Sequence, residues 1–318
     1  MEIFFSAPDL ILWAIPAFVV LLVAEAVFSA IDQRELYETR DTAASLAMGL
    51  GNVAMNLAGK ALALAVFWLL YRWTGFFKDE LSPLHWWSWP LLFVADDFAY
   101  YWFHRISHGC RFFWASHVVH HSSEHYNFST ALRQTWTGTV TGTFAFWLWL
   151  PVLGFHPIAV LTMQSISLIY QFFIHTETVR QLPRPVEWLF NTPSHHRVHH
   201  GSDVDYLDTN HGGVLIVWDR LFGTFEAERD DEAIRYGIVR QLGSWNLLWA
   251  AFHEWIGMFG DAWRAPWRHK LSYLFREPGW SHDGSRETSD AIRARWAQRT
   301  AAQSPPSAEP IAETQRAA

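Results

Sequence analysis

Cysteine is nearly absent from the chain, since Cys110 is the only one in 318 residues. A single thiol excludes an intramolecular disulfide framework, a four-cysteine zinc site and a self-contained iron–sulfur cluster, so any metal must bind nitrogen or oxygen. Charge is also scarce, at 17% of residues, and the formal net charge is -7. Nucleic-acid binding usually needs a basic face, so we expect no nucleic-acid partner.

Apolar and aromatic residues are abundant instead. Half of the chain is hydrophobic, and it holds 20 Trp and 24 Phe, which favours a protein embedded in a bilayer. A crossing helix needs roughly 20 mainly apolar residues, and such stretches run from Leu10 to Ile31, from Thr42 to Tyr71 and from about Leu84 to His104. The first lacks a basic leader and a cleavage site, so we expect it to be retained as a membrane segment.

The stretch from Gln134 to Thr176 carries no Asp, Glu, Lys or Arg. As one helix it would be about twice as long as the ~30 Å hydrocarbon core. Pro151 and Pro157 offer a break, so we predict a two-pass hairpin. An even number of crossings returns the chain to the same membrane face, so the histidines before and after the hairpin can meet. The expected fold is all-α: a bundle of about four to five crossings with a histidine-rich helical cap.

Histidine forms three clusters with helical spacing. They read HRISH, HVVHH and HRVHH, and residues three or four apart share one face of a helix. The clusters comprise His104, His108; His117, His120, His121; and His196, His199, His200. His175, at the end of the hairpin, is a ninth candidate ligand. A lone histidine at a membrane edge is usually structural, but three clusters on one face predict a metal site.

The number of ligands indicates how many metals there are. Eight or nine imidazoles exceed what one octahedral ion accepts, so we predict two. Imidazole suits Zn, Cu, Fe and Ni, and because zinc has no redox chemistry, a nitrogen-rich pair at a bilayer face favours iron for oxygen activation. Glu124, Asn127 and Asp203 are candidate hydrogen-bond partners that fix the imidazole tautomers.

The clusters match a known pattern. All eight positions of HX3H, HX2HH and HX2HH are present, and the chain from about Leu91 to Glu226 resembles the fatty acid hydroxylase superfamily, which includes the sterol desaturases. Strings such as FHRISHGCRFFWASHVVHH and TPSHHRVHHGSDVDYLDTNHGG are similar to the alkylglycerol monooxygenase branch of that superfamily.

The resemblance implies a membrane-bound non-haem di-iron oxygenase with a cytoplasmic histidine cap. The implied reaction is hydroxylation or desaturation of a lipid C–H bond, on an ether lipid, sterol-like or fatty acyl substrate, with O2 as co-substrate. The implied reductant is tetrahydropterin, a cytochrome b5-like protein or a ferredoxin, and the sequence leaves this choice open. Two alternatives also stay open at this point: a zinc-dependent membrane hydrolase, and a metal-binding or transport protein.

The expected organisation follows from these segments. Residues 1–83 hold the N-terminal membrane helices, 84–226 the hydroxylase-like catalytic domain, 227–285 an amphipathic, interfacial region and 286–318 a disordered tail. Within 227–285 we favour an interfacial helix from Leu242 to Trp263 over a further crossing. Arginines accompany the histidines, and basic residues favour the cytoplasmic side. In a bacterial host this places the protein in the inner membrane with the site facing the cytoplasm.

Overall fold

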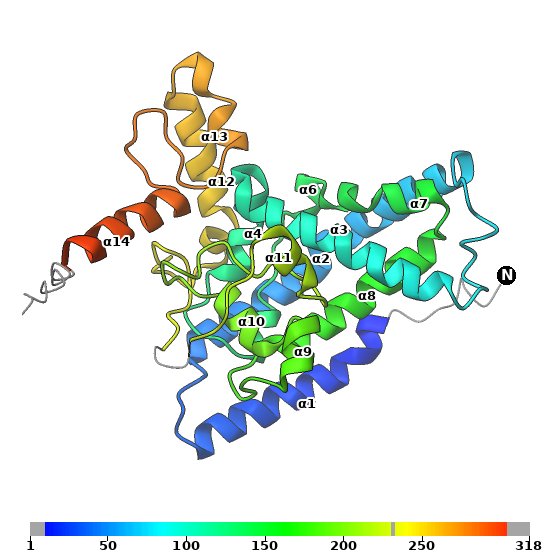
Figure 1. The fold of residues 1–318 in the computed structure, drawn as a ribbon, viewed down its shortest axis with the longest axis horizontal. Coiled ribbons are helices and arrows are strands. Elements are labelled where there is room, and N and C mark those ends of the chain that lie inside the picture. Colours follow the sequence, from blue (N-terminus) through cyan, green and yellow to red (C-terminus); the bar gives the residue numbers. More distant parts are fainter. Residues whose placement is uncertain (1–9, 230–232, 304–318) are drawn as a thin grey trace, which may run out of the picture.

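The computed structural model describes residues 10–229 and 233–303. These residues form helices joined by loops (Figure 1). Extended pairing within the described ranges is limited to two isolated bridges, Phe190 with Leu215 and Gly201 with Tyr236. The expectation of an all-helical chain is confirmed.

Among the described residues, three helices are long and apolar enough to cross a membrane: α1 (Leu10–Ile31), α2 (Thr39–Trp73) and α8 (Pro157–Ile174). The first two correspond to the first two predicted crossings. Large apolar side chains on α1, such as Trp13 and Val20, are exposed. Monomeric soluble proteins rarely expose such a surface along a whole helix, so this exposure fits contact with lipid.

Helix α3 (Ser88–Gly109) corresponds to the third predicted crossing but is not among the candidate spans. Its two acidic residues face protein, as expected for ionisable groups in such a helix. Asp96 accepts a hydrogen bond from Trp147 Nε1 at 2.8 Å, and Asp97 accepts from the backbone N–H of Val214 at 2.7 Å. Both aspartates therefore tie α3 to segments distant in sequence.

The predicted hairpin over Gln134–Thr176 is only half present. Its second leg is α8, which begins at Pro157 beside the expected break. The first leg is divided into three short helices, α6 (Gly138–Thr141), η2 (Thr143–Trp147) and α7 (Trp149–Leu153). Gly142 interrupts it in a left-handed conformation with φ 65°, which glycine adopts at little cost. The two-pass helical hairpin is thus corrected to one apolar helix preceded by broken turns, and four to five crossings stays a prediction.

The three histidine clusters lie at the C-terminal end of α3, on α4 (Arg111–His121) and on α10 (Pro193–His199) with its C-cap, and His175 follows α8. The short helices α5 (Phe128–Ala131), α9 (Arg184–Leu189) and α11 (Val217–Phe222) belong to the segments that connect and follow them. At the other end of the bundle, an apolar core of Phe67, Leu92, Leu150 and Val160 joins α2, α3, α7 and α8.

The C-terminal part adds α12 (Leu247–Arg264), η3 (Trp267–His269), α13 (Ser272–Phe275) and α14 (Ser289–Gln303). In Figure 1, α13 lies beside α12, and α14 projects from the other helices in red-orange. Helix α12 buries Ala251, Trp255 and Met258, packs on α4 and leaves Trp263 exposed. It is amphipathic as predicted, and its interfacial position stays a prediction.

The presence of helix α14 shows that the expected disorder of the C-terminal residues is partly wrong. We expected disorder over 286–318, but residues 289–303 are helical because Ala and Arg there favour a helix and Arg293 Nη1 donates to the carbonyl of Leu207 at 2.7 Å. Residues 304–318 lie outside the described residues.

Candidate metal centre

Four segments bring the nine predicted ligands together. The i, i+4 spacing of His104 and His108 on α3 and the spacing of the cluster on α4 each place imidazoles on one helix face. The third cluster lies at the C-terminal end of α10, and His175 ends α8. Eight of the nine side chains are buried and His117 is half-buried.

The nine imidazoles fall into two groups, each with ligand atoms within 4.8 Å of one another. The five-histidine group is His104, His108, His117, His121 and His199; the four-histidine group is His120, His175, His196 and His200. Each group draws on both sides of the predicted hairpin, so the clusters do meet. Neighbours in sequence are divided between the groups, as with His199 and His200, so the two groups adjoin.

The protonation pattern of the rings leaves lone pairs facing one another. His120 Nδ1 lies 3.2 Å from the carbonyl of Arg133, and His175 Nδ1 lies 2.6 Å from the carbonyl of Gln171. A carbonyl only accepts, so both rings carry their proton on Nδ1 and both Nε2 atoms are bare acceptors. Those two Nε2 atoms are 3.2 Å apart. Two acceptors at this distance repel each other unless a cation lies between them, so the geometry fits a metal ion.

Buried ring nitrogens without a hydrogen-bond partner also indicate a metal site. Nε2 of His108, His199 and His200 is buried and makes no hydrogen bond. An unsatisfied buried polar atom costs about 1–3 kcal/mol, and three in one cluster would be expensive. Metal coordination would satisfy all three, so the donor set fits bound metal.

Burial also keeps the rings neutral. It lowers the pKa of His120 to about 4 and that of His199 to about 3. Burial and the neighbouring imidazoles lower the pKa of His196 and His200 in the same direction. Only a neutral imidazole has a free lone pair, so these rings are ready to bind metal near neutral pH.

The ring orientation is set by groups that sequence analysis did not identify. His104 Nδ1 lies 2.9 Å from the carbonyl of His211, and His199 Nδ1 lies 2.7 Å from that of Thr209. His108 Nδ1 lies 3.0 Å from a carboxylate oxygen of Asp208. Any residue has a carbonyl, so four of the five acceptors leave no trace in the sequence; Asp208 alone is chemically distinctive.

The three residues proposed from sequence for this role lie elsewhere. Asn127 caps α5 and donates to the carbonyl of Leu36 at 2.6 Å. Asp203 accepts from the backbone N–H of Arg235 at 2.9 Å, and Glu124 is exposed. The contacts of Asn127 and Asp203 support the chain around the cluster rather than the imidazoles.

Two further histidines adjoin the ligands without joining either group. His195 pairs with Glu187 at 3.0 Å and belongs to the cap of α10. His211 lies with its ring centre 5.0 Å from that of His108, and its Nδ1 is buried without a partner. The first is structural, and the second borders the five-histidine group.

Two cavities flank the cluster. One, of about 270 Å³, is lined by α2, α3, α8 and the broken turns, with Phe67, Phe144 and Trp147 among its aromatic walls. Two lining residues approach ligands, since the ring of Tyr100 is 5.4 Å from His104 and that of Phe103 is 6.5 Å from His117. This apolar cavity therefore borders the five-histidine group.

The other cavity, of about 660 Å³, is polar, and Arg180, Arg197 and Glu228 are among its lining residues. Tyr236 lines it and stacks on Tyr126 at 5.1 Å, which in turn stacks on His175 at 5.6 Å. The polar cavity is therefore linked by aromatic rings to the four-histidine group.

Comparison with known proteins gives consistent matches. Residues 89–224 match the fatty acid hydroxylase family model. The chain is 35% identical to alkylglycerol monooxygenase of Xenopus tropicalis over 86% of this chain and 60% of that protein. It is 38% identical to the Homo sapiens enzyme of the same name over 86% of this chain and 61% of that protein. The chain thus spans about three fifths of the length of these relatives.

A more distant relative is the ornithine lipid hydroxylase OlsE of Rhizobium tropici, 28% identical over 44% of this chain and 45% of that protein. No solved structure is significantly similar.

Proposed function

We propose that the chain, whose residues 89–224 match the fatty acid hydroxylase family model, is a membrane-embedded di-iron monooxygenase that hydroxylates a lipid C–H bond. The observation that carries the proposal is the pair of histidine groups with their Nε2 lone pairs turned inward. Nine nitrogen ligands divided five and four suit two metals better than one.

Iron fits the donors and the reaction. Two bound irons would supply the activation of O2 and the oxidant for a C–H bond, chemistry that no side chain offers. The five-histidine group would hold one and the four-histidine group the other. For each turnover, one substrate, one O2, two electrons and two protons give the hydroxylated lipid and one water.

The apolar cavity is the proposed position of the substrate's hydrocarbon chain. Its walls belong partly to the candidate spans α2 and α8, so a lipid can approach from the bilayer. Phe103 and Tyr100 would hold the chain against the five-histidine group while the aromatic walls exclude water. The relatives are named for lipid substrates, alkylglycerols and ornithine lipids, so an ether lipid is the first substrate to test.

Electrons are proposed to enter from the polar cavity, where Tyr236 and Tyr126 connect its wall to His175. The donor is a tetrahydropterin, a cytochrome b5-like protein or a ferredoxin. For a bacterial host we place the protein in the inner membrane with the histidine end toward the cytoplasm, because Arg105 and Arg197 lie within the histidine clusters of α3 and α10.

The test is anaerobic purification in detergent, followed by metal analysis and O2 uptake with a reductant and an alkylglycerol. We expect about two irons per chain, lipid-dependent O2 uptake and a hydroxylated or ether-cleaved product in mass spectra. One zinc per chain with no O2 uptake after iron reconstitution would overturn the proposal in favour of a zinc hydrolase or a metal-binding protein.

A further inference from the structure

The short loop of residues 208–211 contacts three of the five ligands in the five-histidine group. Its three acceptors are the Asp208 carboxylate, the Thr209 carbonyl and the His211 carbonyl, which bind Nδ1 of His108, His199 and His104 respectively. Each contact places the ring proton on Nδ1 and leaves Nε2 free for metal. One loop therefore sets the tautomer and orientation of three ligands drawn from two different helices.

The backbone of this loop is unusual. Asp208 and Asn210 have φ of 53° and 54°, in the left-handed region that side chains other than glycine rarely adopt. Such conformations persist only where the surroundings impose them, and they concentrate at functional sites. Here they turn acceptors on three of the four loop residues toward the ligands.

Buried polar contacts impose that shape. The Asn210 amide donates to the carbonyls of His195 at 3.0 Å and Glu226 at 2.7 Å. The Asp219 carboxylate accepts from the backbone N–H groups of His211 and Gly212, each at 2.7 Å. The loop is thus fixed at its centre and at its C-terminal end.

Helix α14 fixes the N-terminal end. Arg293 Nη1 donates to the carbonyl of Leu207 at 2.7 Å. A segment after residue 288 therefore holds the residue that directly precedes Asp208, the acceptor of His108.

In the four-histidine group, the two rings with an identified Nδ1 acceptor bond residues outside the 208–211 loop. His175 donates to Gln171 on its own helix, and His120 donates to Arg133. The imidazoles of the two groups are therefore oriented by separate parts of the chain.

We propose that the 208–211 loop is the positioning device of the five-histidine metal site alone, with Asp208 as its charged positioning residue and α14 as its anchor. A carboxylate that accepts the proton of a ligating imidazole fixes the ring and raises its basicity, and loss of such a partner typically weakens metal binding 10–100-fold. The inference rests on the two-metal part of the proposed function but not on the lipid reaction.

The experiment titrates the full-length metal-free protein in detergent with Fe(II) or Co(II) under anaerobic conditions. The wild type should bind two ions. Asp208→Ala should bind one ion normally and the other 10–100-fold more weakly. Asp208→Asn keeps an acceptor oxygen and should recover most of that loss. The control is Asp205→Ala, three residues away, where the side chain is exposed and pairs with Arg229; it should bind as the wild type does.

Arg293→Ala, which removes the α14 contact with Leu207 together with an exposed ion pair to Asp290, should weaken the same site by a smaller factor and serves if Asp208→Ala fails to fold. Equal weakening of both ions in a folded Asp208→Ala, or none, overturns the inference. Selective weakening in a protein that oxidises no lipid would leave the inference standing and overturn the proposed function. If the wild type oxidises lipid but Asp208→Ala still binds both ions tightly, the inference is overturned and the proposed function stands.

Discussion

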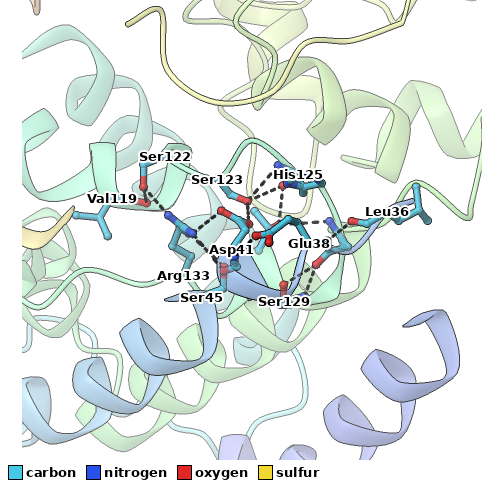
Figure 2. Close-up of polar contacts among 12 residues, drawn as sticks. Leu36, Glu38, Asp41, Ser45, Val119, Ser122, Ser123, His125, Ser129 and Arg133 are labelled. Carbon is cyan, nitrogen blue, oxygen red and sulfur yellow. Dashed lines mark hydrogen bonds and ion pairs between the residues drawn. The ribbon is translucent and has the colours of Figure 1, made fainter. Parts of the chain in front are cut away.

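Arg133 and Asp41 form a buried ion pair, with Nη2 of the arginine 2.6 Å from Oδ1 of the aspartate (Figure 2). Figure 2 also shows the guanidinium contacting Ser45 and Ser122, so that it joins the start of α2 to the end of α4. The carbonyl of the same arginine accepts from His120 Nδ1. The ion pair therefore holds the acceptor that orients one ligand of the four-histidine group.

Removing this aspartate should weaken the four-histidine site. Asp41→Ala leaves a buried guanidinium without its counter-ion, which typically costs about 3–5 kcal/mol. We expect a lower melting temperature and weaker binding of the ion that Asp208→Ala leaves unaffected, measured by the same metal titration.

The matched control is Asp32→Ala. Asp32 pairs with Arg34 on the surface, where an ion pair contributes about 1 kcal/mol or less, so stability and both sites should be retained. An Asp41→Ala protein as stable as the wild type with two tight ions would contradict this account of Arg133.

Removing one ligand from each group tests the assignment of the groups themselves. His199→Ala takes a ligand from the five-histidine group and His120→Ala from the four-histidine group. We expect each to lose about one iron per chain and at least about 100-fold in lipid-dependent O2 uptake. His253→Ala, on α12, where the ring bonds only backbone carbonyls of its own helix, should match the wild type. If both ligand variants bind iron and retain full turnover, the di-iron assignment is wrong.

That the histidines of each cluster share one side of a helix could be predicted from sequence, because helical spacing alone sets it. His108 follows His104 by four positions, and in each later cluster the last two histidines follow the first by three and four positions, so a helix turns them toward one face. The division into five and four could not be predicted, since it separates His120 from His121 and His199 from His200. That depends on how α4 and α10 pack, which is tertiary information.

The supporting contacts were predicted poorly for the same reason. Arg133 meets Asp41 from 92 positions away, and Asp208 meets His108 from 100 positions away. Asn127 and Asp203 lie near the clusters in sequence yet bond elsewhere. In the membrane part, hydropathy located α1, α2 and α8, but it missed the broken turns before α8, where Gly142 and Gly154 have positive φ.

The metal-free protein should lose stability in mild acid. Burial holds the folded pKa of His120 near 4 and that of His199 near 3, below about 6.5 in an unfolded chain. Between these values the unfolded chain binds more protons, so the free energy of unfolding falls as pH falls. Thermal melts in detergent should show a melting temperature several degrees lower at pH 5.5 than at pH 7.5.

His199→Asn removes one of these groups and should show a smaller fall. An unchanged melting temperature across that range would mean that the rings are not held neutral by burial.

Filling the apolar cavity should block the substrate without disturbing the metals. Ala63 on α2 is buried and lines the cavity, whereas its neighbour Leu62 is half exposed on the outer face of the same helix. Ala63→Phe places a ring where the hydrocarbon chain is proposed to lie, and displacement of a reacting group by even about 1 Å can cost 100-fold in rate. We expect iron content to stay at the wild-type level while lipid-dependent O2 uptake falls about tenfold or more.

The control Leu62→Phe adds a ring of the same kind toward lipid and should leave iron content and O2 uptake unchanged. If Ala63→Phe turns over alkylglycerol at the wild-type rate with full iron, the hydrocarbon chain lies elsewhere, and the search for its site moves to the other cavity beside Tyr236.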